Sequence, residues 1–189
     1  MILSKKVFLF LSLIFSTLIL FSSCGDDEDP VIPNDEELIT TLTYTLTATD
    51  KPTVVFSFKD LDGDGGNSPV ITEGTLLANT VYEGKIELLN EIDGESITEE
   101  VKEESAEHQF FFSNTNTNIS IFYADIDDSA QNNPVGLETT LTTSQPATGK
   151  LKITLRHEPN KDAEGVSDGN IANAGGETDI EVEFDVTVE

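Results

Sequence analysis

The feature that most constrains this chain is an alternation of apolar and polar side chains with a period of two. It begins near residue 41 and recurs in short runs as far as the C-terminus. In the last run, acidic residues and one threonine alternate with five apolar residues: Ile180, Val182, Phe184, Val186 and Val188. Successive side chains of a β-strand point to opposite faces. The pattern therefore predicts strands that have one apolar face and one polar face.

The alternating runs predict about eight strands and an all-β fold. They lie at 41–48, 54–58, 81–89, 109–113, 119–124, 136–142, 150–157 and 179–188. Clusters of Gly, Asn, Asp and Pro separate them at intervals typical of a β-sandwich. We therefore expect an antiparallel, immunoglobulin-like sandwich. One short helical turn is expected at 96–104, because Ser96 and Glu99 have capping-box spacing and Ile97 and Val101 lie one turn apart.

The N-terminus predicts a cleaved leader. Lys5 and Lys6 precede an apolar stretch over residues 7–21, which is short for a membrane span, and Ser22-Ser23 stand before Cys24, the only cysteine. This order is typical of a lipobox, although Phe21 stands where leucine is usual. The alternatives are an uncleaved anchor helix or an ordinary cysteine. We expect a lipoprotein signal peptide at 1–23, lipidation of Cys24, an acidic, Pro-containing linker at 24–37 and the sandwich at 38–189.

The expected location follows from the linker. The run Gly25-Asp26-Asp27-Glu28-Asp29 is similar to the acidic signal that Bacteroidota lipoproteins carry after their cysteine. The similarity implies a lipid anchor in the outer membrane and exposure at the cell surface, with the periplasmic leaflet as the alternative.

The charge of the chain excludes several classes of partner. It has 36 Asp and Glu against 10 Lys and Arg, for a net charge of -26. Such a chain repels phosphate backbones and anionic lipid headgroups, so nucleic acid is excluded, and cations or basic partners remain. Acidic strand faces favour a monomer. One cysteine allows no internal disulfide and no zinc site built from cysteines alone.

Two acidic loops are candidate sites for a hard cation. Asp60, Asp62 and Asp64 stand at alternate positions before glycines, so their oxygens can turn toward one point, as Ca²⁺ requires. No glutamate follows at position twelve of this loop, and a solvated turn is the equal alternative. The loop at 125–128 is weaker because it lacks glycine. Weaker still are Asp162, Asp168 and Asp179, which lie in or beside a long Gly/Asn-rich connection.

The two histidines are the candidate ligands for a softer metal. His108 follows Glu107 and His157 precedes Glu158, each pair at the end of an alternating run. If the two strands are neighbours, both imidazoles can bind Zn²⁺ or Cu²⁺, with Glu107, Glu158 or Glu100 completing the site. The alternative is that both histidines bond to loop carbonyls and have only a structural role.

Nothing in the sequence supports catalysis or an organic cofactor. Gly165-Val166-Ser167-Asp168-Gly169 matches the letters of a nucleophile elbow, but loop residues flank it and no histidine follows His157. The Gly-rich loop at 63–66 is too acidic to receive a phosphate. We expect no catalytic residues, and the sequence disfavours a hydrolase.

Several segments resemble a group of uncharacterised flavobacterial surface lipoproteins. They are residues 54–66, His108-Gln109-Phe110-Phe111-Phe112, residues 155–161 and residues 175–180. Members of this group are often labelled "type 1 periplasmic binding fold superfamily protein", which implies an α/β fold, whereas the period-two pattern predicts a β fold. The group also looks like small lipoproteins that accompany TonB-dependent receptors, which implies a receptor as partner.

These observations together predict a lipid-anchored binding module. We expect a non-enzymatic β-sandwich that binds a cation and serves as an accessory to an outer-membrane receptor. The alternative is a structural or adhesive surface module in which Ca²⁺ stiffens the Asp loops.

Overall fold

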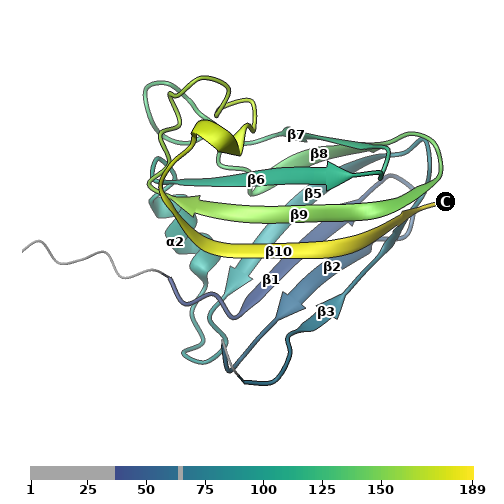
Figure 1. Ribbon diagram of the computed structural model, residues 1–189, viewed down its shortest axis with the longest axis horizontal. Coiled ribbons are helices and arrows are strands. Elements are labelled where there is room, and N and C mark those ends of the chain that lie inside the picture. Colours follow the sequence, from purple (N-terminus) through teal and green to yellow (C-terminus); the bar gives the residue numbers. More distant parts are fainter. Residues whose placement is uncertain (1–36, 64–65) are drawn as a thin grey trace, which may run out of the picture. The chain divides into compact units, whose positions relative to one another are not determined.

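The protein is a sandwich of two β-sheets, seen in the computed structural model, which describes residues 37–63 and 66–189 (Figure 1). The predicted all-β sandwich is confirmed, with ten strands where the sequence predicted about eight. The predicted leader, Cys24, the linker as far as residue 36, and Asp64 lie outside the described residues.

The larger sheet has six strands in the order β3-β2-β1-β5-β8-β7, and all neighbours are antiparallel. Five of its strands were predicted, while β3 is three exposed residues without alternation. The bounds are β1 Thr41–Thr47, β2 Val54–Lys59, β3 Val70–Thr72, β5 Val81–Leu89, β7 Ile119–Tyr123 and β8 Glu138–Thr143.

The smaller sheet has four strands in the order β4-β10-β9-β6. Its bounds are β4 Thr75–Leu76, β6 His108–Thr115, β9 Ala147–His157 and β10 Glu177–Val188. The two-residue strand β4 was not predicted, and it runs parallel to β10, so the sandwich is not wholly antiparallel. Strands β6, β9 and β10 cross obliquely in front of the larger sheet (Figure 1).

The core lies between the two sheets, where their apolar faces meet. Phe56 of the larger sheet packs edge-on against Phe184 of the smaller, with ring centroids 5.6 Å apart. Tyr44 contacts Phe112 across the same space at 6.0 Å. The buried hydroxyl of Tyr44 shares a hydrogen bond of 2.7 Å with Thr139, because a buried hydroxyl without a partner is costly. The alternation that defined the strands thus also defines the core.

The predicted helical turn forms as α2, Ile97–Glu103, which packs beside β5. Its buried side chains include Ile97 and Val101, as their spacing predicted. The capping box does not form, since the Ser96 side chain makes no cap bond. Instead the Thr98 hydroxyl donates to the Leu88 carbonyl at 3.1 Å and accepts from its N–H at 2.7 Å.

A buried lysine ties together the loops at the end of the sandwich where β6 begins and β9 ends. The Lys161 ammonium donates to the Asp127 carboxylate at 3.1 Å and to the carbonyls of Ser105 and Pro134 at 2.6 and 3.1 Å. Three different connections therefore meet at one cation.

No helix in the described part of the chain has the length and apolar character needed to cross a membrane.

Candidate metal centre

The two histidines lie directly opposite each other on neighbouring strands. His108 is the first residue of β6, His157 is the last of β9, and they are register partners in the antiparallel ladder. Their rings stack with centroids 4.7 Å apart and planes inclined by 18°. The His108 side chain is fully buried, and that of His157 is 7% exposed. The condition on which a two-histidine site depends, that the strands be neighbours, is met.

A β-bulge brings a carboxylate to these rings. The pairing of β10 with β9 shifts between Thr178 and Ile180, so Asp179 is the extra residue of the bulge. A bulge re-aims a side chain that would otherwise alternate. The Asp179 side chain is fully buried, although the following Ile180 is also buried. Its oxygens lie 3.9 Å from His108 Nε2 and 4.0 Å from His157 Nδ1.

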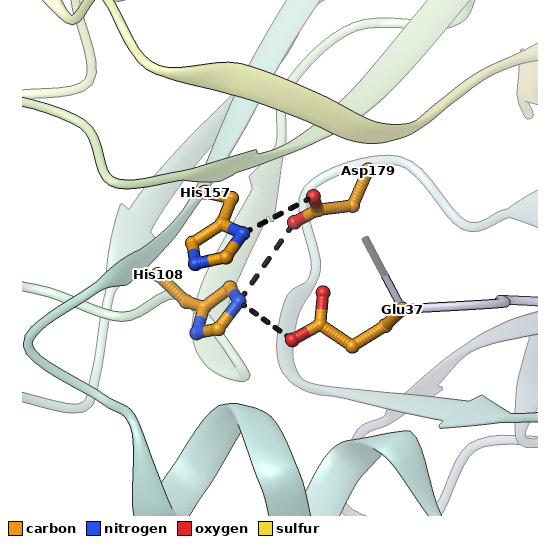
Figure 2. Close-up of side chains that lie close together, drawn as sticks. All are labelled: Glu37, His108, His157 and Asp179. Carbon is orange, nitrogen blue, oxygen red and sulfur yellow. Dashed lines mark ion pairs between the residues drawn. The ribbon is translucent and has the colours of Figure 1, made fainter. Parts of the chain in front are cut away.

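The second carboxylate comes from the segment that leads into β1. Glu37 Oε1 lies 3.3 Å from His108 Nε2, and the side chain is only 9% exposed. Its other oxygen, Oε2, is buried and has no hydrogen-bond partner among the described residues. Figure 2 shows both carboxylates facing the same side of the stacked rings. A buried carboxylate oxygen without a partner calls for an explanation, and an absent ion is one of the standard ones.

The backbone fixes the orientation of the His108 ring. Nδ1 lies 3.2 Å from the carbonyl oxygen of Glu104, just after α2. Only a protonated nitrogen can donate to a carbonyl, so this contact places a proton on Nδ1. In the neutral ring the lone pair then lies on Nε2, which faces Glu37 and Asp179. Metal-binding histidines are commonly held in this way by a carbonyl behind the ring.

Electrostatic contacts in the cluster shift the ionisation of two members. The His108 imidazole beside Glu37 lowers the pKa of that carboxyl, and its effect outweighs burial. Burial alone would lower the pKa of His108, but Glu37, the Glu104 carbonyl and Asp179 together raise it. Both shifts therefore stabilise an imidazolium ion paired with the Glu37 carboxylate when no metal is bound.

The geometry of the four side chains fits a small divalent metal. One ligand atom from each of Glu37, His108, His157 and Asp179 can be chosen so that all lie within 4.8 Å of one another. Tetrahedral Zn²⁺ with bonds of 2.0–2.1 Å separates its ligands by about 3.4 Å. The contact of 3.3 Å is already near that value, those of 3.9 and 4.0 Å must contract by about 0.5 to 0.6 Å, and the remaining pairs of ligand atoms lie within 4.8 Å. Two carboxylates with two neutral imidazoles carry a charge of -2, which one divalent ion cancels.

The predicted partners Glu107 and Glu158 form a second, outer group with the other side of His157. Each contributes a carboxylate oxygen within 4.8 Å of a His157 nitrogen and of the other oxygen. His157 Nε2 lies 4.0 Å from Glu107 Oε2, whereas Nδ1 faces Asp179. Glu100, the remaining predicted partner, belongs to neither group. The sequence prediction therefore named both imidazoles and the outer carboxylates, placed Asp179 only among the weak candidates for a hard cation, and missed Glu37.

In the described residues, the carboxylates of the Asp60 loop accept hydrogen bonds from groups of the loop itself. Asp60 accepts hydrogen bonds from the backbone of Asp62 and Gly63, while Asp62 accepts from the backbone and side chain of Asn67. These bonds lower the pKa of Asp62, chiefly that from the Asn67 backbone. Asp64 lies outside the described residues, so the predicted calcium site stays a prediction.

The other sequence candidates have local roles. Asp125 accepts from the backbone of Gly136 and Glu138, and Asp162 accepts from Asn133. Ser167 is exposed in a run of turns, with no strand before it and no helix directly after it.

No protein-family model matches this chain, and comparisons with curated proteins and with solved structures also gave no match.

Proposed function

We propose that the protein is a binding module for a transition-metal ion of the zinc or copper type, held by Glu37, His108, His157 and Asp179. The observation that carries this proposal is the burial of two imidazoles and two carboxylates around one point. Buried carboxylates are costly unless a cation pairs with them. Imidazole nitrogen favours Zn²⁺ and Cu²⁺ over Ca²⁺, which prefers six to eight oxygen ligands.

The number and burial of the ligands favour a site that holds a metal ion over a site at which a metal ion catalyses a reaction. Catalytic zinc sites keep one position open for water or substrate, whereas structural sites use four protein ligands. Here four side chains are available, and none is more than 9% exposed. A captured ion would join β6, β9 and β10 to the segment before β1. The proposal therefore includes stabilisation of this end of the sandwich by the metal.

The sequence suggests where such a module works. We propose a lipid anchor on Cys24 at the outer membrane, and an outer-membrane receptor as partner, on the strength of the leader pattern and the resemblance described above. The segment 24–36 would separate the acyl group from Glu37, and thirteen residues span at most about 45 Å when extended. The metal site would then lie within that distance of the membrane.

Calorimetric titration of the purified protein with Zn²⁺ tests the proposal. At pH 7.5 we expect one tight equivalent. Asp179→Asn should weaken binding at least about 100-fold, because the loss of a direct ligand should exceed the effect of losing an outer-shell partner. Asp185→Asn is the matched control, since Asp185 lies on the same strand with its side chain 62% exposed and should leave the affinity unchanged.

The pH dependence gives a second readout. A metal competes with protons for imidazole nitrogen, so Zn²⁺ affinity should fall more than about tenfold at pH 5, which is below the ordinary histidine pKa of about 6.5. Ca²⁺ held by the Asp60 loop would survive that pH. The absence of Zn²⁺ and Cu²⁺ binding, or equal effects of the two Asp variants, would contradict the proposal.

A further inference from the structure

The outer group of Glu107, His157 and Glu158 suggests a route by which a metal ion reaches the buried group of four ligands. This inference rests on the proposed function. The four inner side chains are at most 9% exposed, so a hydrated ion cannot reach them directly. By contrast, the Glu107 side chain is 54% exposed, and Glu158 is exposed at the end of β9. Both carboxylates are therefore accessible to a cation from solvent.

His157 is common to both groups and presents a different nitrogen to each. Nδ1 faces Asp179 and Nε2 faces Glu107, each at 4.0 Å. In Figure 2 the second nitrogen of the His157 ring points away from the inner carboxylates. An ion held by Glu107, Glu158 and Nε2 is therefore separated from the inner group by the width of one ring.

The backbone holds the outer carboxylates in place. The Glu158 N–H donates to the Glu107 carbonyl at 2.7 Å, which joins the start of β6 to the end of β9. Glu158 itself has a φ of 48°, a left-handed conformation that is uncommon for a non-glycine residue. Such conformations persist only where the surrounding structure enforces them.

We propose that Glu107, Glu158 and His157 Nε2 form an exposed capture site for divalent transition metals, from which the ion moves past the edge of the His157 ring to the buried group: its bond to Nε2 breaks, a bond to Nδ1 forms, and the proton on Nδ1 passes through solvent to Nε2. Three ligands and open solvent make this site weaker than the inner one. The capture site raises the rate of binding, and because it speeds release equally, it leaves the equilibrium affinity of the inner group unchanged.

Stopped-flow mixing with Co²⁺, followed through the visible absorption of the tetrahedral ion, tests the inference on the purified protein. Glu107→Gln/Glu158→Gln should lower the association and dissociation rates about tenfold each while the Kd stays within about twofold. The control Glu83→Gln/Glu87→Gln removes the same charge from exposed positions of β5 on the other sheet, and should leave both rates near those of the unaltered protein. The single variant Glu107→Gln removes one of the two carboxylates at an exposed position, and it should slow both rates in the same way but to a smaller extent.

The outcomes separate this inference from the proposed function. Tight Co²⁺ binding with unchanged rates in both double variants would overturn the capture site and leave the inner site standing. Equal slowing in the control would assign the effect to overall charge and overturn the inference. A lost equilibrium affinity in Glu107→Gln/Glu158→Gln would also overturn it, since those carboxylates would then be ligands of the final state. Absence of binding in the unaltered protein would overturn both.

Discussion

Single atoms decide what the His108 ring can do. The carbonyl of Glu104 lies 3.2 Å behind Nδ1, so Nε2 faces two carboxylates with either a proton or a lone pair. The first state gives an ion pair with Glu37, and the second gives a metal ligand. Both states use the same contacts, which is why the ring can remain in place when a metal displaces the proton.

The buried pair of Lys161 and Asp127 shows how one charge supports several loops. Burial would raise the pKa of Asp127, but hydrogen bonds from Ser129 and the ion pair with Lys161 outweigh it and lower the pKa. A carboxyl whose pKa is lower in the folded state stabilises the fold above its unfolded pKa of about 3.9. That contribution is lost as the pH falls through the lower, folded value.

Asp127→Asn should therefore reduce the free energy of unfolding by about 3 kcal/mol at pH 7, because it leaves a buried lysine without its counterion. The difference from the unaltered protein should shrink as the pH falls below about 3.9, because Asp127 is then protonated first in the unfolded chain and, at its lower pKa, in the folded protein. Urea unfolding between pH 7 and pH 2.5 measures both. Asp162→Asn, at an exposed carboxylate that accepts from Asn133, is the control and should change little. A difference that stays constant over this range would contradict the role of the ion pair.

At the level of strands and turns, two irregular features place the candidate ligands: the β-bulge in β10 and the turn that precedes it. The bulge at Asp179 interrupts the alternation of β10, so that Asp179 and Ile180 are both directed inward. The turn before β10 has a similarly specific requirement. Gly176 has a φ of 67°, and a Cβ there would come within 2.1 Å of the His157 carbonyl oxygen. The absence of a Cβ at Gly176 thus allows this turn to pack against the end of β9, next to both groups of candidate ligands.

Gly176→Ala should therefore be more damaging than Gly175→Ala. Gly175 also has a positive φ, of 62°, but a Cβ there would meet nothing within 4 Å. Both variants incur the left-handed penalty of about 1–2 kcal/mol, and only Gly176→Ala must also displace His157 and Glu158. We expect Gly176→Ala to lower the free energy of unfolding further and to weaken Zn²⁺ binding, as measured by urea unfolding and calorimetry. Equal loss of stability and affinity in the two variants would show that the close contact does not position the site.

The regular part of the fold could be predicted from the sequence because burial imposes alternation. Eight strands and the core faces followed from that pattern, and the helix followed from the one-turn spacing of Ile97 and Val101, whereas β3 and β4 are too short to show alternation. The helix prediction was right for Ile97, for Val101 and for Ser96 as the N-cap residue, but the Ser96 side chain makes no cap bond. The bonds of Thr98 to Leu88 join the start of the helix to β5.

The site was only half predictable, for a physical reason. His108 and His157 stand beside glutamates at strand ends, and that local signal was sufficient to select them. Asp179 was misplaced because strict alternation assigns it to the acidic outer face, and a one-residue bulge has no clear sequence signature. Glu37 lies in an acidic segment, where no local feature distinguishes one carboxylate from another. Only the pairing of β6, β9 and β10 brings these residues together.

At the scale of the molecule, the proposed metal joins parts that are distant in sequence. Three ligands come from neighbouring strands of the smaller sheet, and the fourth comes from the segment that enters the larger sheet. A ligand that binds only the folded state stabilises it by a free energy that grows with the logarithm of the ligand concentration relative to Kd, and that reaches about 2.7 kcal/mol at 100 times the Kd. Metal binding would thus couple the two sheets at the end where the N-terminal segment joins the sandwich.

A crystal structure of the Zn²⁺-loaded protein, with anomalous scattering measured at the zinc edge, is the decisive test of the four-ligand site. We expect a strong peak between Nε2 of His108 and Nδ1 of His157, with oxygens of Glu37 and Asp179 completing a four-coordinate site at about 2.0–2.2 Å. Empty density at this position in crystals that bind zinc elsewhere, or in crystals saturated with zinc, would contradict it.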